Sequence, residues 1–251
     1  VYFGNAAPAI STSSTSTGTI SFSSSNTSVA TINSSTGSIT LVGIGTATFT
    51  INQANTTNYK SSSTTTSLTI NRGTPTLSGF ALSSSSVVYG ASAPTITAPT
   101  SPSSGALSYT SSNTAVATIS GSTITIVGIG STTFTVTQAA NGNYGSANAT
   151  ATLTVTAATP TLTASLSATS VVYASTAPTL SYTSNSSGAV TYTSSNTAVA
   201  TVSGSTITIV GVGSTTFTAT QAANGNYDTA TSTVTLTVTT ATPTLSGFAL
   251  S

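Results

Sequence analysis

The chain has 251 residues, of which 109 are Ser or Thr and only three are charged, namely Lys60, Arg72 and Asp228. His, Cys, Met and Trp are absent. Hydrolysis by paired carboxylates needs two acidic groups, and a Ser nucleophile needs a basic group beside it. This composition therefore predicts a protein that is not an enzyme and has no catalytic residues.

The same inventory excludes most ligand sites. Zinc, iron–sulfur, haem and calcium sites lack their usual ligands, so we expect no metal and no cofactor. A net charge of +1 provides no basic patch for nucleic acid, and no apolar run reaches the roughly 18–20 residues of a membrane span. The 37% of hydrophobic residues are patterned, which favours a folded chain over a disordered one.

Internal repetition is the strongest signal. The sequence SSNTSVATI at 24–32 returns as SSNTAVATI at 111–119 and as SSNTAVATV at 194–202. TPTL recurs at Thr74 and at two later positions, again about every 84 residues. A period of this length is that of a domain, so the sequence predicts tandem β-domains.

Within the second copy, apolar residues alternate with Thr and Ser over about seven short segments separated by turns. The expected strands and turns, in chain order, are an opening strand or strand pair at 74–83, then 86–90, a Pro-punctuated stretch at 93–105, 106–112, a hairpin of 116–120 with 123–128, 132–139, an NGN turn at 141–143, and 149–157. Strand alternation predicts an inward-facing set of Val116, Ile124, Ile126, Phe134, Val136, Leu153 and Val155. The number and spacing of the strands favour an immunoglobulin-like sandwich.

The sequence SSNTAVATISGSTITIVGIGSTTFTVTQ at 111–138 resembles the bacterial Ig-like repeat of group 2, found in invasin and intimin-type surface proteins. The shared features are SSN, VAT, a Gly-turn hairpin and VG-x-G-[ST], and they recur three times along the chain. The chain departs from that family in its near absence of charge and in having Tyr109 and Tyr192 where a Trp is usual. The resemblance implies a bacterial extracellular or cell-surface array without a catalytic site.

We therefore expect an all-β chain of three Ig-like sandwiches of about 84 residues in a linear rod. The predicted divisions are 1–73, which lacks its opening strand, 74–158, 159–241, and an orphan opening strand at 242–251. Two interpretations of the ends stay open. The favoured one is a window from a longer tandem array, and the other is donation of a strand to the open first domain of another copy. The candidate assembly residues are Thr242, Pro243, Thr244, Leu245, Phe248 and Leu250.

Three tyrosines occupy one repeat position, after a turn: Tyr59, Tyr144 and Tyr227. They are weak candidates for stacking on sugar rings, and core or corner tyrosines are the favoured interpretation. Lys60 and Asp228 follow two of them and are interpreted as exposed charges rather than as an ion pair.

These observations predict a structural component of an extracellular bacterial fibre, either a filament subunit or an adhesin stalk segment. The alternative is a carbohydrate-binding or cell-adhesion module. The expected partners are copies of the chain itself, with host or surface glycans as a second possibility. A surface with almost no charge predicts contacts between copies that depend little on salt.

Overall fold

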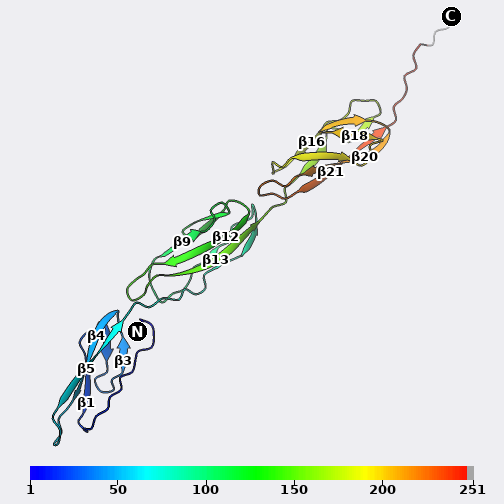
Figure 1. Ribbon diagram of the computed structural model, residues 1–251. Coiled ribbons are helices and arrows are strands. Elements are labelled where there is room, and N and C mark those ends of the chain that lie inside the picture. The colour runs from blue at the N-terminus through cyan, green and yellow to red at the C-terminus, as the bar shows by residue number, and fades with distance from the viewer. Residues whose placement is uncertain (248–251) are drawn as a thin grey trace.

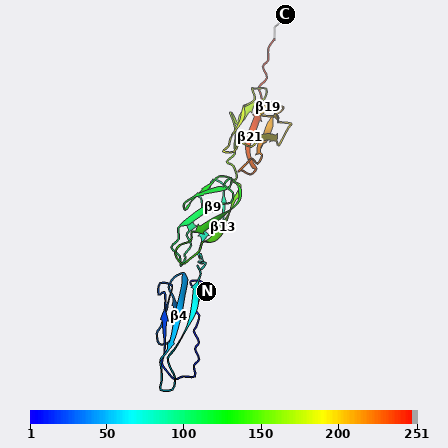
Figure 2. The same ribbon diagram turned by 60° about the vertical axis from the view of Figure 1, so that its left-hand side comes forward.

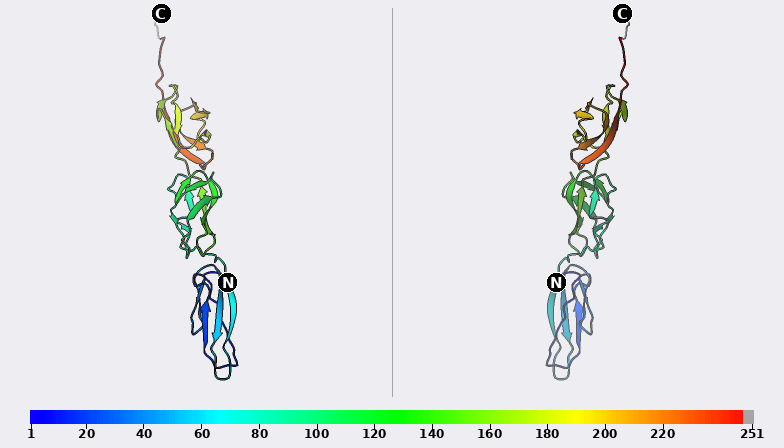
Figure 3. Two further views of the ribbon diagram at one scale, coloured as in Figure 1. Left: turned by 90° about the vertical axis from the view of Figure 1, so that its left-hand side faces the viewer. Right: turned by 90° about the vertical axis from the view of Figure 1, so that its right-hand side faces the viewer.

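The computed structural model describes residues 1–247 and contains 21 β-strands. Its ribbon is a row of three β-sandwiches that follow one another along a line (Figure 1). Turning the molecule leaves this linear arrangement unchanged, and the N-terminus lies beside the first of the two junctions (Figures 2 and 3). Residues 1–247 contain no helix, and hence none long and apolar enough to cross a membrane. The predicted all-β class is confirmed.

The second sandwich has the complete set of strands. They are β6 (Ala81–Leu82), β7 (Ser86–Val88), β8 (Ile96–Thr97), β9 (Leu107–Ser111), β10 (Ala117–Ser120), β11 (Thr123–Ile126), β12 (Gly130–Gln138) and β13 (Ala147–Thr156). One sheet has the order β7-β13-β12-β9, with β7 parallel to β13 and the other pairs antiparallel. The antiparallel pairs β6-β8 and β10-β11 form the rest of the sandwich.

The third sandwich repeats this plan. Its strands are β14 (Thr163–Leu166), β15 (Ser170–Val172), β16 (Leu180–Thr183), β17 (Val190–Ser194), β18 (Ala200–Ser203), β19 (Thr206–Ile209), β20 (Gly213–Gln221) and β21 (Ala230–Thr239). The large sheet has the order β15-β21-β20-β17, and β14-β16 and β18-β19 are the two short pairs.

The first sandwich has fewer strands. They are β1 (Ile20–Ser24), β2 (Ala30–Ile32), β3 (Ile39–Leu41), β4 (Gly45–Gln53) and β5 (Ser62–Ile70). The sheet β1-β4-β5 and the pair β2-β3 are present. The counterpart of β7 is reduced to a parallel bridge between Tyr2 and Asn71. The divisions placed after residues 73, 158 and 241 stay predictions, and no strand ladder between named strands crosses them.

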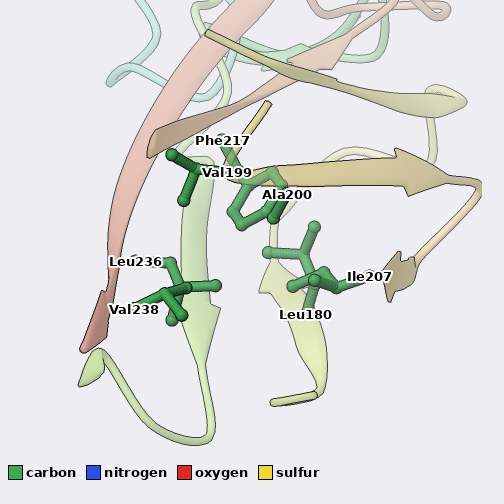
Figure 4. Packing of buried hydrophobic residues seen from close by; sticks show 7 residues of the cluster. All are labelled: Leu180, Val199, Ala200, Ile207, Phe217, Leu236 and Val238. Carbon is green, nitrogen blue, oxygen red and sulfur yellow. The ribbon is translucent and has the colours of Figure 1, made fainter. Parts of the chain in front are cut away.

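Alternation along the longest strands sets the inside and the outside of each sandwich. On β12, Thr132, Phe134, Val136 and Gln138 are buried, whereas the residues between them are half-buried or exposed. Of the predicted inward-facing set in the second sandwich, all are buried except Ile126, which is half-buried and packs against the same cluster. The third sandwich has an equivalent cluster around Phe217 (Figure 4). The cores are thus built from one aromatic ring and several small aliphatic side chains.

The cores also hold polar side chains that are fully hydrogen-bonded. Gln221 is buried, its Oε1 accepts from Ser184 Oγ at 2.6 Å, and its Nε2 donates to the carbonyls of Ser186 at 2.9 Å and Gly188 at 3.0 Å. Thr215 is buried and bonded to Ser194 Oγ at 2.8 Å. Gln221 thus fixes the loop that precedes β17 to the sheet, and Thr215 fixes the end of β17.

Tyr192 on β17 is the exception, because its buried hydroxyl has no hydrogen-bond partner among the described residues. Burial, and in second place the phenol of Tyr182, raise the pKa of Tyr192. We expect Tyr192→Phe to keep the free energy of unfolding or to raise it by up to about 1 kcal/mol, since no hydrogen bond is lost.

The pH dependence checks the same point. The folded wild type holds the phenol proton of Tyr192 more tightly than the unfolded chain does. The free energy of unfolding therefore falls as the pH rises past 10.0, the ordinary pKa of a tyrosine. Tyr192→Phe removes this contribution to the fall. Urea unfolding of both chains at about pH 7 and about pH 10.5 measures it. The control is Tyr173→Phe, since Tyr173 is exposed and is not among the groups that raise the pKa of Tyr192. A large loss of stability in Tyr192→Phe at neutral pH would contradict this account.

Candidate assembly site at the repeat junctions

The predicted NGN turn, continued by Tyr144, lies at the boundary between the first and second sandwiches. The turn is closed by two backbone hydrogen bonds between Asn141 and Tyr144, both 3.0 Å long. Gly142 has φ +54°, a conformation that glycine adopts without strain. The third sandwich builds the same turn with Asn224 and Tyr227. Both turns project toward the preceding sandwich.

Backbone hydrogen bonds tie each turn to the last residue of the preceding repeat. Gly73 N–H donates to the carbonyl of Asn143 at 3.0 Å, and Gly145 N–H donates to the carbonyl of Gly73 at 2.8 Å. At the second junction Ala158 makes both bonds, with Asn226 at 3.0 Å and with Asp228 at 2.9 Å. Two successive repeats are thus joined by a short parallel bridge as well as by the chain itself.

The side chain of Asn143 makes a further link. Its Oδ1 accepts from Ile44 N–H at 3.1 Å, and its Nδ2 donates to the carbonyl of Val42 at 3.3 Å. At the second junction Asn226 Oδ1 accepts from Ile129 N–H at 3.0 Å. The receiving loop is Val-Gly-Ile in both cases, and a Cβ on Gly43 would lie 2.6 Å from the carbonyl of Ser28. A glycine is therefore required for the compact loop that receives the asparagine.

An aromatic pair completes each junction. The rings of Phe3 and Tyr144 meet edge to face with centroids 5.4 Å apart, and those of Tyr89 and Tyr227 do so at 5.8 Å. Edge-to-face pairs of this kind contribute about 0.5–1.5 kcal/mol beyond their buried area. We define the junction clamp as the Asn-Tyr turn of one repeat together with the Val-Gly-Ile loop, the aromatic ring and the terminal backbone residue of the repeat before it.

Tyr59, the third candidate tyrosine, lies at the far end of the first sandwich, in the turn between β4 and β5. Thr56 N–H donates to the carbonyl of Tyr59 at 2.8 Å, and Tyr59 N–H donates to Thr56 Oγ1 at 3.2 Å rather than to a backbone carbonyl as in the other repeats. The ring is 49% exposed, whereas Tyr144 and Tyr227 are half-buried. Tyr144 and Tyr227 thus pack against the repeat before them, whereas Tyr59 contacts no other repeat in this structure. Sugar stacking stays a prediction for all three tyrosines.

The charged candidates and the orphan strand lie elsewhere. Lys60 and Asp228 are exposed and occupy the same position in two different repeats. Residues 240–247 form no strand and run away from the third sandwich (Figure 1). Of the assembly residues, Thr242, Pro243, Thr244 and Leu245 are exposed, while Phe248 and Leu250 lie outside the described residues. Residues 1–247 also hold no group of three or more potential metal ligands.

Comparisons with known proteins give structural likeness only. No family model matches the chain, and no curated protein matches it. A crystal structure of mouse protocadherin-24 EC1-3 is similar with a TM-score of 0.33 and 13% identity, covering 95% of this chain and 93% of that one. Drosophila N-cadherin EC1-4 is similar with a TM-score of 0.32 and 11% identity, covering 89% of this chain and 67% of that one. Domains 1-6 of surface layer protein SbsC are similar with a TM-score of 0.30 and 16% identity, covering 91% of this chain and 36% of that one. The similarity to the invasin and intimin repeats therefore stays a prediction.

Proposed function

We propose that the chain is a non-enzymatic structural segment of an extracellular fibre, in which stacked Ig-like sandwiches act as a semi-rigid rod. The observation that carries the proposal is the junction clamp, which recurs at both junctions with the same backbone hydrogen bonds, the same bond to the asparagine Oδ1 and an edge-to-face aromatic pair. Domains joined by a bare linker move relative to one another by default. Two clamps restrain that motion along the whole chain.

The linkers support the same role. Pro75 and Pro160 follow the clamp residues Gly73 and Ala158 and are buried. Proline fixes its own φ and restricts the residue before it, so both connections are stiff. A rod of this kind carries tension and spaces the groups at its ends. It needs no catalytic group, which agrees with a chain that has one carboxylate and no histidine.

Replacing both clamp asparagines, Asn143→Ala with Asn226→Ala, is expected to make the rod flexible. The change removes the side-chain hydrogen bonds between repeats, each worth about 0.5–1.5 kcal/mol, without touching a core. Small-angle X-ray scattering of the full chain measures it. The wild type should scatter as a straight rod at low and at high salt, because few charges are present to be screened, and the double variant should lose the longest interatomic distances.

The turns provide a matched control. Asn141 and Asn224 lie in the same two turns, but their side chains donate to Ser104 Oγ and Ser187 Oγ of their own repeats, both at 2.8 Å. Asn141→Ala with Asn224→Ala should therefore keep the straight rod. Scattering from a bent or collapsed wild-type chain, or a steep change with ionic strength, would contradict the proposal.

Carbohydrate binding is the second candidate. Tyr227 lines a shallow hollow of about 430 Å³ together with hydroxyl and amide groups from Ser184 to Ser187. A ring already paired with Tyr89 has less free surface for a sugar, which is why the structural role is preferred. Polysaccharide binding that is lost in Tyr227→Ala while the rod stays straight would favour this candidate.

A further inference from the structure

The turn of each junction clamp contains an asparagine that is followed by a glycine. The two pairs are Asn141-Gly142 and Asn224-Gly225, and no other asparagine of the chain precedes a glycine. The first repeat has Thr56-Thr57 at these positions. The pair therefore occurs only in the two turns that contact a preceding repeat in this structure.

Asparagine is a thermolabile residue, because its side chain can react with the peptide nitrogen of the residue that follows. That nitrogen attacks Cγ, a C–N bond forms and the Cγ–Nδ2 bond breaks. Ammonia leaves with the proton of the attacking nitrogen, and a five-membered succinimide remains. Water then adds to one of the two ring carbonyls and breaks its bond to nitrogen, which gives either aspartate or isoaspartate. The sequence of steps consumes only water.

The structure leaves both the attacking nitrogen and the reacting amide accessible. The N–H groups of Gly142 and Gly225 donate to no backbone carbonyl among residues 1–247. A Cβ at either glycine would meet no atom within 4 Å, so the space around the nitrogen is open. Asn141 and Asn224 are exposed. Each pair thus combines an unhindered nucleophile with an amide that water reaches.

The other asparagine of the same turn lacks these properties. Asn143 is followed by Tyr144, whose N–H is engaged, because it donates to the carbonyl of Asn141 at 3.0 Å. The amide of Asn143 is itself held by the preceding repeat, since its Oδ1 accepts from Ile44 N–H at 3.1 Å. The turn therefore contains one reactive asparagine and, two residues later, a protected one.

We propose that Asn141 and Asn224 are sites of self-modification, at which the turns of the junction clamps convert in water to aspartate and isoaspartate. The consequence for the rod rests on the proposed fibre role, whereas the conversion itself does not. Each conversion adds one negative charge, so the two together take the net charge from +1 to −1. In a chain with a single carboxylate this is a large change, and it falls at both junctions.

The two products affect the junction differently. Aspartate keeps the backbone, and the hydroxyl of Ser104, which accepts from Asn141 Nδ2 at 2.8 Å, can donate to the new carboxylate instead. Isoaspartate leads the main chain through Cβ and Cγ, so the carbonyl that accepts from Tyr144 N–H is displaced by a methylene. The turn then no longer holds Asn143 against the Val-Gly-Ile loop, and the clamp loosens.

Peptide mapping by mass spectrometry tests the sites. The full chain is kept in warm, mildly alkaline buffer, and the exchange of amide for carboxylate is followed at each asparagine, with an isoaspartate-specific methyltransferase to detect the second product. Asn141 and Asn224 should convert on the order of tenfold faster than Asn143 and Asn226, because glycine has no Cβ to hinder the attack. No conversion at the first two, or an equal rate at the second two, would overturn the proposal.

The first repeat allows the site to be transplanted. Thr57 N–H, like that of Gly142, donates to no backbone carbonyl among residues 1–247. Thr56→Asn with Thr57→Gly should therefore create a third site, with a rate similar to that of Asn141. Thr56→Asn alone is the matched control and should convert on the order of tenfold more slowly, because the Cβ of Thr57 stays. Equal rates in the two variants would count against the proposal.

Scattering from aged chains measures the consequence. The aged wild type should lose its longest interatomic distances, whereas Asn141→Ala with Asn224→Ala, aged in the same way, should keep them. Fresh Asn141→Asp with Asn224→Asp should also stay straight, because its backbone is unchanged. An aged chain that contains isoaspartate at both turns and stays straight would overturn the loosening of the clamp. A bent wild-type chain before ageing would contradict the fibre role alone, so the two proposals fail separately.

Discussion

Phe217→Ala is expected to lower the free energy of unfolding of the third sandwich by about 3–5 kcal/mol, the usual cost of removing a buried aromatic ring. Phe217 is fully buried, and it lies at the centre of a cluster that includes Leu180, Val199 and Leu236 (Figure 4). The sandwich has about 84 residues and no disulfide, and domains of this size have a total stability of roughly 5–15 kcal/mol. The loss is therefore a large share of what holds this repeat together.

Hydrogen exchange on the full chain measures this loss repeat by repeat. Backbone amides of 159–241 should lose protection in Phe217→Ala, whereas those of 1–73 should keep it, because the clamps link neighbouring repeats and the cores are separate. Thr220→Ala is the control, since Thr220 is an exposed residue of the same strand. Equal loss of protection in all three repeats would show that the rod unfolds as one unit.

The architecture of a complete repeat could be predicted from sequence because its signals are local. Ile124, Phe134 and Leu153 alternate with Thr along strands, and each lies in the core as predicted. The hairpin at Gly121, where φ is +56°, follows from a glycine between two alternating runs. Repetition of the pattern then extends the prediction to the third repeat.

The junction clamp could not be predicted in the same way. Asn143 contacts Val42 and Ile44, about a hundred positions earlier, and no local pattern encodes that contact. The available signal was recurrence, since NGNY and VGIG or VGVG return together in the second and third repeats. Turn chemistry explained these motifs adequately by itself, so their second role was missed. The absence of an opening strand from the first repeat, inferred by aligning Val1 with Val87, stays a prediction.

The buried glutamines were also missed, because only apolar residues were expected inside, although Gln221 shares the alternation phase of Phe217. Gln221→Leu is expected to destabilise the third sandwich by about 3 kcal/mol, since the hydroxyl of Ser184 and the carbonyls of Ser186 and Gly188 lose their hydrogen bonds to a fully buried amide. The first repeat contains a matched site. Gln53 makes the same three hydrogen bonds at 2.6, 3.0 and 3.1 Å, yet it is half-buried.

Gln53→Leu should therefore cost clearly less than Gln221→Leu in the monomeric chain, because water reaches the groups that it leaves unpaired. Urea unfolding and hydrogen exchange of the two variants measure the difference. Equal costs would show that the partial exposure of Gln53 does not change what its hydrogen bonds contribute. The comparison thus measures how much of a repeat's stability depends on the burial of this amide.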